Sequence, residues 1–155
     1  MPGDYDDLVK IEFRGTGETG EAEVETLWAT PLGDDLYRLE NSPCFAYGVS
    51  LLDTVRARSA ANGLPVFEAV VKKSGNRTVR VILDPPAEAG NSSAGMLDEL
   101  VALGASYEGA SRKYMAVNIG PEVDLERVCR FLTEEAVQWE HADPTYEALC
   151  AGSAG

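Results

Sequence analysis

The sequence predicts an α+β protein in which a small N-terminal β-barrel, or set of antiparallel strands, packs with a C-terminal ferredoxin-like βαββαβ sandwich. Three observations support this prediction. Apolar and polar residues alternate with period two through residues 8–14 and 23–30. Residues 91–103 and 124–136 each carry one apolar stripe at helical spacing. Short runs rich in Val and Ile flank those two helical segments, as strands do in a split βαβ unit.

The N-terminal strands follow from this alternation. Leu8–Arg14 and Glu23–Thr30 are predicted half-buried strands, and Leu36–Leu39 returns after a Gly- and Asp-containing turn to complete a hairpin. Residues 41–48 are expected to form a buttressed loop that closes the barrel, and residues 49–58 a turn followed by a strand. The alternative is that these strands extend the edge of the C-terminal sheet.

The middle of the chain is predicted to be a basic hairpin. Val66–Lys73 and Thr78–Leu83 are strong strand candidates, and Ser74–Arg77 has the composition of a hairpin turn. Residues 54–82 contain six basic side chains against one carboxylate, in a chain whose formal net charge is −13. This hairpin would join an N-terminal subdomain at residues 7–77 to a ferredoxin-like subdomain at residues 78–146.

The C-terminal elements carry the clearest boundary signals. Asn91, Ser92 and Ser93 are N-cap candidates for the first helix, and Gly104 is its expected stop. Asp124 is the N-cap candidate of the second helix. Strands are expected at residues 105–108, 113–119 and 137–142, and both helices are expected on one face of a four-stranded antiparallel sheet. Residues 1–6 and 151–155 are expected to be frayed.

Composition restricts the class of protein. A hydrophobic content of 45% suits a globular domain, and three widely spaced cysteines predict neither a disulfide framework nor a zinc site. No signal sequence or membrane span is predicted, so we expect a cytoplasmic protein that uses no metal or cofactor. The net charge disfavours nucleic acid and anionic membranes and is compatible with a basic protein partner.

Two side chains are candidate catalytic groups. His141 lies next to Glu140 and could act as a general base with a carboxylate, although consecutive strand residues point to opposite faces. Cys44 follows a proline turn, but no base or helix start is evident nearby to lower the pKa of its thiol. Structural interpretations are preferred for both residues: His141 as a hydrogen-bonded edge histidine, and Cys44 as a packed or exposed thiol.

An anion site is the more developed chemical hypothesis. Backbone N–H groups around Gly75, supported by Lys72, Arg77 and Arg80, could hold a phosphate or carboxylate. The spacing matches no nucleotide-binding loop, and cations beside a turn can also be solvated ends that protect an edge strand. Arg56 precedes the hairpin and could instead pair with Asp53.

Six short segments carry a family resemblance: Glu25–Ala29, Tyr37–Pro43, Gly48–Ser50, Asp53–Val55, Ser74-Gly75 and Thr78–Val81. Together they resemble bacterial domain-of-unknown-function family 4265. The resemblance implies no chemistry. It singles out Glu25, Asn41, Asp53 and Arg80 as site candidates without a ready structural role. Independently of the resemblance, Asp53 is a weak catalytic candidate beside His141 and Cys44. The C-terminal half also looks like the acidic ferredoxin-like regulators of ribonuclease E, type B, which act by binding a protein.

The leading expectation is therefore a non-catalytic acidic binding protein, a regulator or immunity-type inhibitor, that acts on a basic protein partner. The alternative is a small-molecule or anion-binding accessory protein, or an enzyme of a biosynthetic cluster. Its site would use Arg80, Arg56, Lys72, Arg77 and Gly75, with Glu25 and Asn41 as neighbours. Hydrolysis or isomerisation by a carboxylate with His141 is a third possibility, and a homodimer is plausible.

Overall fold

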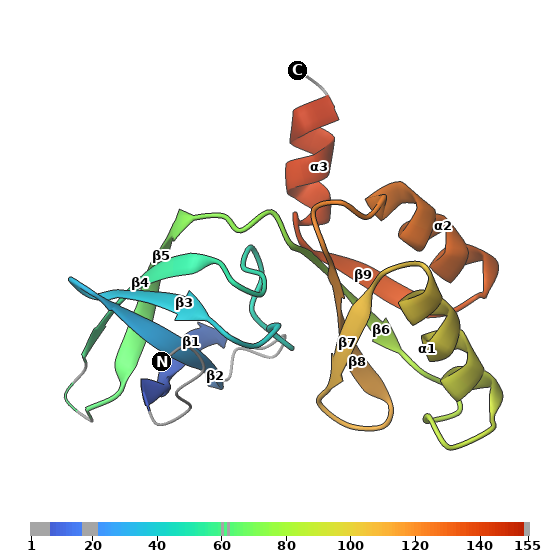
Figure 1. Cartoon of the computed structure of the whole chain (residues 1–155), viewed down its shortest axis with the longest axis horizontal. Helices are drawn as coiled ribbons and strands as arrows, with labels where there is room; N and C mark the ends of the chain where they lie inside the picture. The colour runs from blue at the N-terminus through green and yellow to red at the C-terminus, as the bar shows by residue number, and fades with distance from the viewer. Residues whose placement is uncertain (1–6, 17–21, 60, 62, 154–155) are drawn as a thin grey trace.

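The computed structural model describes residues 7–16, 22–59, 61 and 63–153. The N-terminal strands are β1 (Val9–Thr16), β2 (Ala22–Gly33), β3 (Leu36–Leu39), β4 (Thr54–Ser59) and β5 (Pro65–Lys72). The remaining elements are β6 (Arg77–Ile82), α1 (Ser92–Ala102), β7 (Ser106–Gly109), β8 (Tyr114–Ile119), α2 (Leu125–Glu134), β9 (Gln138–Asp143) and α3 (Tyr146–Ser153). Figure 1 shows two β-structures side by side, with α1 and α2 on the far side of the second.

Strands β1 to β5 form a closed barrel, as the sequence predicted. Neighbours along the chain pair antiparallel, and β1 closes the barrel by pairing in parallel with β5 at Glu12 and Val66. The alternating pattern of β1 and β2 places Ile11, Leu27 and Ala29 inside, fully or almost fully buried. The strands therefore make their own core rather than extending the other sheet.

Strands β6 to β9 form a second sheet with the order β7-β8-β6-β9, in which every pair is antiparallel. The element order strand–helix–strand–strand–helix–strand is the predicted one. Both helices pack on the face that carries Val79 and Val81, and the buried set is Val79, Val81, Leu83, Met96, Leu97, Leu100, Ala105, Met115, Val117, Ile119, Val128 and Leu132. On the opposite face of β6, the buried side chains of Thr78 and Arg80 bond residues of the segment between β3 and β4, so both faces of the strand are covered.

The predicted helix boundaries are confirmed by their caps. The Asn91 side chain accepts a hydrogen bond from the Ala94 amide at 2.9 Å, and Asp124 accepts one from Arg127 at 3.4 Å. Gly104 follows α1 with φ of 103°. Helix α3 was not predicted, and it extends through Ser153 where fraying was expected. None of the described helices is long and apolar enough to cross a membrane.

The predicted basic hairpin is wrong. Strand β5 pairs with β4 and β1, whereas β6 pairs with β8 and β9, so the two strands belong to different sheets. The intervening turn is held by distant partners: Ser74 Oγ donates to the Leu51 carbonyl at 2.7 Å, and Asn76 Nδ2 donates to the same oxygen at 3.0 Å. These long-range bonds direct the chain from the barrel to the second sheet.

Gly75 is needed at this crossing for a conformational reason. Its φ is 96°, and a Cβ atom there would lie 3.1 Å from Cβ of Pro121. We expect Gly75→Ala to lower the free energy of unfolding by about 1–2 kcal/mol, because it adds a strained φ and a close contact. Gly95→Ala is the matched control: this helical glycine has open space, so the change should stabilise α1 by roughly 0.5–1 kcal/mol. Denaturant titrations showing the same sign for both variants would contradict this role.

Candidate functional site

The 41–48 loop lies between the barrel and the second sheet and is bonded to both. Figure 1 shows this segment, which follows β3, between the two β-structures. The sequence led us to expect a loop that closes the barrel, but closure is achieved by the pairing of β1 with β5. The loop instead fills the interface, where its backbone groups need partners because they are partly removed from water.

Glu25 supplies those partners from the barrel. It sits on β2 opposite Phe13, and its carboxylate accepts three consecutive backbone N–H groups of the loop. The distances are 2.5 Å from Cys44, 3.1 Å from Phe45 and 2.9 Å from Ala46. Hydrogen bonds to a charged acceptor are stronger than neutral ones, so this one side chain fixes the turn at 44–46.

Arg80 supplies the matching contacts from the second sheet. Its neighbours in β6 point into the core under the helices, so Arg80 points the other way, and the whole residue is only 2% exposed. The guanidinium donates to the carbonyl of Phe45 at 2.8 Å and to that of Ala46, and lies 4.7 Å from the centre of the Tyr47 ring. Glu140 is a more distant partner at 3.9 Å. A planar fork of donors suits two adjacent carbonyls.

Three further side chains complete the attachment. Glu108 on β7 accepts from the Ser42 amide at 2.5 Å and from Asn41 Nδ2 at 3.0 Å. Asn41 Oδ1 accepts from the Trp28 amide at 2.9 Å, which ties the loop back to β2. The Tyr114 hydroxyl donates to the carbonyl of Cys44 at 2.9 Å. The backbone of this loop is therefore bonded at most of its polar groups.

A second polar cluster anchors the chain after the loop. Asp53 is fully buried and accepts from the amides of Ser50 at 2.9 Å and Ser74 at 2.8 Å. The Lys73 ammonium bridges Asp53, at 2.5 Å, and Asp143 at the end of β9. The Ser50 hydroxyl also donates to Asp143 at 2.6 Å. Barrel and sheet are thus joined by one cation shared between two carboxylates, and the partner of Asp53 is Lys73 rather than Arg56.

The side chains predicted for an anion site do not converge. Arg56 and Lys72 belong to the barrel strands β4 and β5, where they pair in register with Ala69 and Thr54. The Arg77 guanidinium donates to the carbonyls of Gly120 and Val123 at 2.5 Å each. Within the described residues, no hydrogen bond or ion pair joins Arg56 or Lys72 to Arg80. The structure does bring Glu25, Asn41 and Arg80 together, as holders of the 41–48 loop.

The three catalytic candidates, His141, Cys44 and Asp53, share no hydrogen bond or ion pair within the described residues. His141 shares a face of β9 with Trp139, whose ring lies 4.8 Å away, while Glu140 points to the loop side. Burial lowers the pKa of His141. Burial, and then the carboxylates of Glu25 and Glu108, raise the pKa of the Cys44 thiol. In the part of the chain that the structure describes, no three His, Cys, Asp or Glu side chains are placed to hold a metal ion.

These pKa shifts predict the order of cysteine alkylation. Thiolate is the reacting species, and burial raises the pKa of Cys129 to about 11. We expect iodoacetamide at about pH 8 to modify exposed Cys150 well before Cys44 and Cys129. Mass spectrometry of the peptides measures the rate of modification at each cysteine. The Cys129 rate should still be climbing at about pH 10. Equal rates at Cys44 and Cys150 would contradict the described environment of the loop.

A hollow opens beside the loop at one end of the barrel. Its volume is about 540 Å³, and we call it the aromatic hollow; its lining residues are Phe13, Arg14, Gly15, Glu23, Val24, Glu25, Phe45, Ala46, Tyr47 and Phe67. Phe45 and Tyr47 are 53% and 55% exposed although their backbone is fixed. Sequence reasoning missed this hollow because its lining comes from four separate segments. Two aromatic residues in a polar, turn-rich loop were the available signal.

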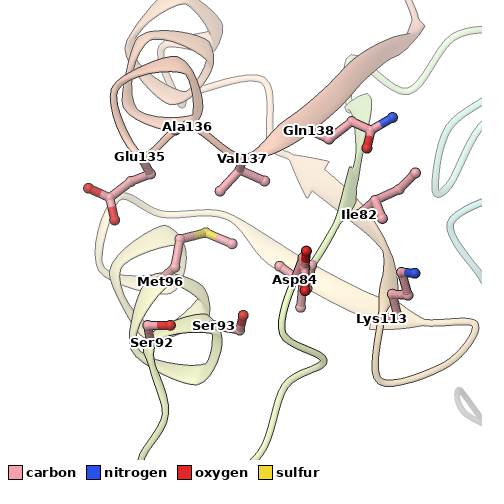
Figure 2. A pocket seen from close by; sticks show the side chains of 11 residues that line it. Ile82, Asp84, Ser92, Ser93, Met96, Lys113, Glu135, Ala136, Val137 and Gln138 are labelled. Carbon is pink, nitrogen blue, oxygen red and sulfur yellow. The ribbon is translucent and has the colours of Figure 1, made fainter.

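A second hollow, of about 380 Å³, lies between the start of α1, the end of β6 and the turn before β9. Figure 2 shows Asp84 near its centre, with Glu135 and Lys113 at opposite sides. The start of α1 is already capped by Asn91, and the Ser93 hydroxyl donates to the Pro85 carbonyl at 2.5 Å. The charged groups do not gather on one point, so no site is built there.

Comparison with known proteins identifies a matching family model and a solved structure with a similar fold. A family model described as a domain of unknown function (DUF4265) matches residues 25–142. Among solved structures, the chain is similar to a hypothetical protein from Neisseria gonorrhoeae, with a TM-score of 0.75 and 18% sequence identity, over 90% of this chain and 96% of that one. At this identity the likeness shows a shared fold alone. No curated protein matches the chain.

Proposed function

This chain belongs to the family described as a domain of unknown function (DUF4265), and we propose that it is a non-catalytic acidic protein that binds a basic protein partner. The observation that carries the proposal is the 41–48 loop. It is fixed from both sides by Glu25 and Arg80, yet it leaves Phe45 and Tyr47 half exposed beside a hollow. Aromatic anchors on a rigid backbone are characteristic of binding hot spots.

The charge distribution supports a basic partner. The chain carries a formal net charge of −13, and the exposed carboxylates of its second half outnumber the exposed cations. Those carboxylates are Asp84, Glu88, Asp98, Glu99, Glu122, Asp124, Glu126, Glu134, Glu135, Glu140 and Glu147. Opposite charge would accelerate the encounter and make binding sensitive to salt.

The topology supports the same proposal at the level of fold. A strand order of β7-β8-β6-β9 with both helices on one face fits the ferredoxin-like (split βαβ) arrangement. We therefore infer that the second half is a ferredoxin-like sandwich, and that a regulator or immunity-type role is the one it would serve.

The anion-binding alternative has weaker support. Arg80 donates to two carbonyls, Arg77 to two others, and Lys73 lies between two carboxylates. An anion would have to displace acceptors that the chain already provides. The hairpin on which that alternative rested does not form.

The test is affinity capture from cells that express this chain naturally, at low and at high salt. We expect a basic protein to be retained in stoichiometric amount at low salt, and to be released as salt screens the charges. Tyr146→Ser, which changes an exposed aromatic on α3, should capture it equally well. The absence of any stoichiometric partner at low salt would overturn the proposal.

A further inference from the structure

We propose that the aromatic hollow binds a guanidinium or ammonium side chain of the partner, so that it is a cation-recognition site rather than a general apolar groove. The inference rests on the proposed function and specifies its chemistry. Four of the ten lining residues are aromatic: Phe13, Phe45, Tyr47 and Phe67. Aromatic faces attract a cation through the negative potential of the ring, and the attraction grows as water is excluded.

The aromatic rings are already held in place. Phe13 and Phe67 stack with their centres 4.7 Å apart, and Phe45 stacks on Tyr114 at 5.6 Å. The Tyr47 hydroxyl donates to Glu140 at 2.8 Å. Burial, and then this hydrogen bond, raise the pKa of the Tyr47 phenol, which stays protonated and keeps the bond. Because the rings need little reordering, a ligand loses less entropy on binding.

The charges that line the hollow favour a cation. Glu23 and Glu25 are its two carboxylates and Arg14 is its one cation. Arg14 lies 3.5 Å from Glu12, so its charge is partly compensated outside the lining. The three amides that bond Glu25 are neutral donors, and a carboxylate offers about four acceptor positions, so Glu25 keeps an unused acceptor position. The hollow therefore combines aromatic faces with net negative charge.

The chain itself shows that this loop region accepts a guanidinium. Arg80, which does not line the hollow, lies 4.7 Å from the ring centre of Tyr47 and bonds the carbonyls on the same turn. That guanidinium is buried and belongs to the fold. A partner side chain would approach from the open side, where Tyr47 and Phe45 are exposed and Glu23 lies at the rim.

The direct test is a nuclear magnetic resonance titration with N-acetylarginine amide and with its neutral isostere, N-acetylcitrulline amide. We expect arginine to shift the amides of Gly15, Phe45, Ala46 and Tyr47 with a Kd on the order of 1 mM, and citrulline to bind at least about tenfold more weakly. Two variants isolate the causes. Phe45→Leu keeps the apolar bulk but removes an aromatic face, and Glu23→Gln removes one exposed charge; each should weaken arginine binding several-fold.

Tyr107→Ala is the control, since Tyr107 is an exposed aromatic on β7 outside the lining, and it should bind arginine like the wild type. Equal shifts from arginine and citrulline, or shifts elsewhere on the surface, would overturn the inference. So would self-association through the hollow, detected as a dimer in light scattering that Phe45→Leu abolishes. Salt-sensitive capture of a partner that survives Phe45→Leu and Glu23→Gln would overturn this inference and leave the proposed function standing.

Discussion

Replacing Arg80 by alanine is expected to lower the free energy of unfolding by about 3–4 kcal/mol. The guanidinium is buried and bonds the carbonyls of Phe45 and Ala46. Its removal leaves two carbonyls without a donor and a space under the Tyr47 ring, and each unsatisfied buried group costs about 1–3 kcal/mol. Arg80→Lys should recover only part of the loss, because a single ammonium cannot reproduce the fork.

Urea unfolding followed by circular dichroism measures this change. Arg112→Ala is the matched control, because Arg112 is an exposed arginine that pairs with Glu88 at 3.0 Å. An exposed pair contributes at most about 1 kcal/mol, so this variant should unfold close to the wild type. If Arg80→Ala were no more destabilising than Arg112→Ala, Arg80 would not be holding the loop.

Asp53→Ala should have the second large effect, a loss of about 3 kcal/mol. Its carboxylate accepts from the amides of Ser50 and Ser74 and pairs with Lys73, so alanine leaves the two amides without their acceptor, while Lys73 keeps Asp143. Because Lys73 is partly exposed, water can compensate its ammonium, and most of the loss comes from the two amides. Asp53→Asn should also be destabilising, since one of its two acceptor oxygens becomes a donor.

The control for Asp53 is Glu88→Ala, which removes an exposed carboxylate from a surface ion pair. It should change the free energy of unfolding by less than about 1 kcal/mol. Thermal unfolding of the three proteins at one pH gives the comparison. Similar melting temperatures for Asp53→Ala and Glu88→Ala would show that the junction between barrel and sheet does not depend on this carboxylate.

The contacts of Arg80 and Asp53 show why the family motif includes polar residues. Glu25, Asn41, Asp53 and Arg80 had no structural reason in the sequence, and the structure gives each of them a bond to the segment between β3 and β4 or to its anchor. Gly48, with φ of 80°, serves the same segment. The motif therefore describes how the loop is held. What the loop presents to a partner is a separate matter, carried by Phe45 and Tyr47.

Local signals predicted most of the fold. The N-caps Asn91 and Asp124 and the left-handed Gly104 are short-range features, and the helices begin and end where those residues indicate. The hairpin at Ser74–Arg77 failed because its turn composition is local, whereas its geometry is decided by the distant Leu51 carbonyl and Asp53 carboxylate. Turn chemistry alone could not distinguish a hairpin from a crossing between sheets.

The candidate site was less predictable for the same physical reason. Glu25 lies 19 or more positions before the amides whose hydrogen bonds it accepts. Arg80 lies 34 or 35 positions after the carbonyls to which it donates. Charge patterns could suggest that Arg80 had a partner, but carbonyl acceptors have no sequence signature. The anion hypothesis rested on a cluster of basic residues, but the donors of Arg77 and Arg80 already bond backbone carbonyls.

The most direct test of the central claim, that Glu25 and Arg80 hold the 41–48 loop as a rigid platform, is hydrogen exchange of the Cys44, Phe45 and Ala46 amides. We expect these three amides to be protected in the wild type to a degree comparable with the amides of β6, and to exchange much faster in Glu25→Gln, whose fold should otherwise persist. Exchange of the same amides at the rate of an unstructured peptide in the wild type would contradict it.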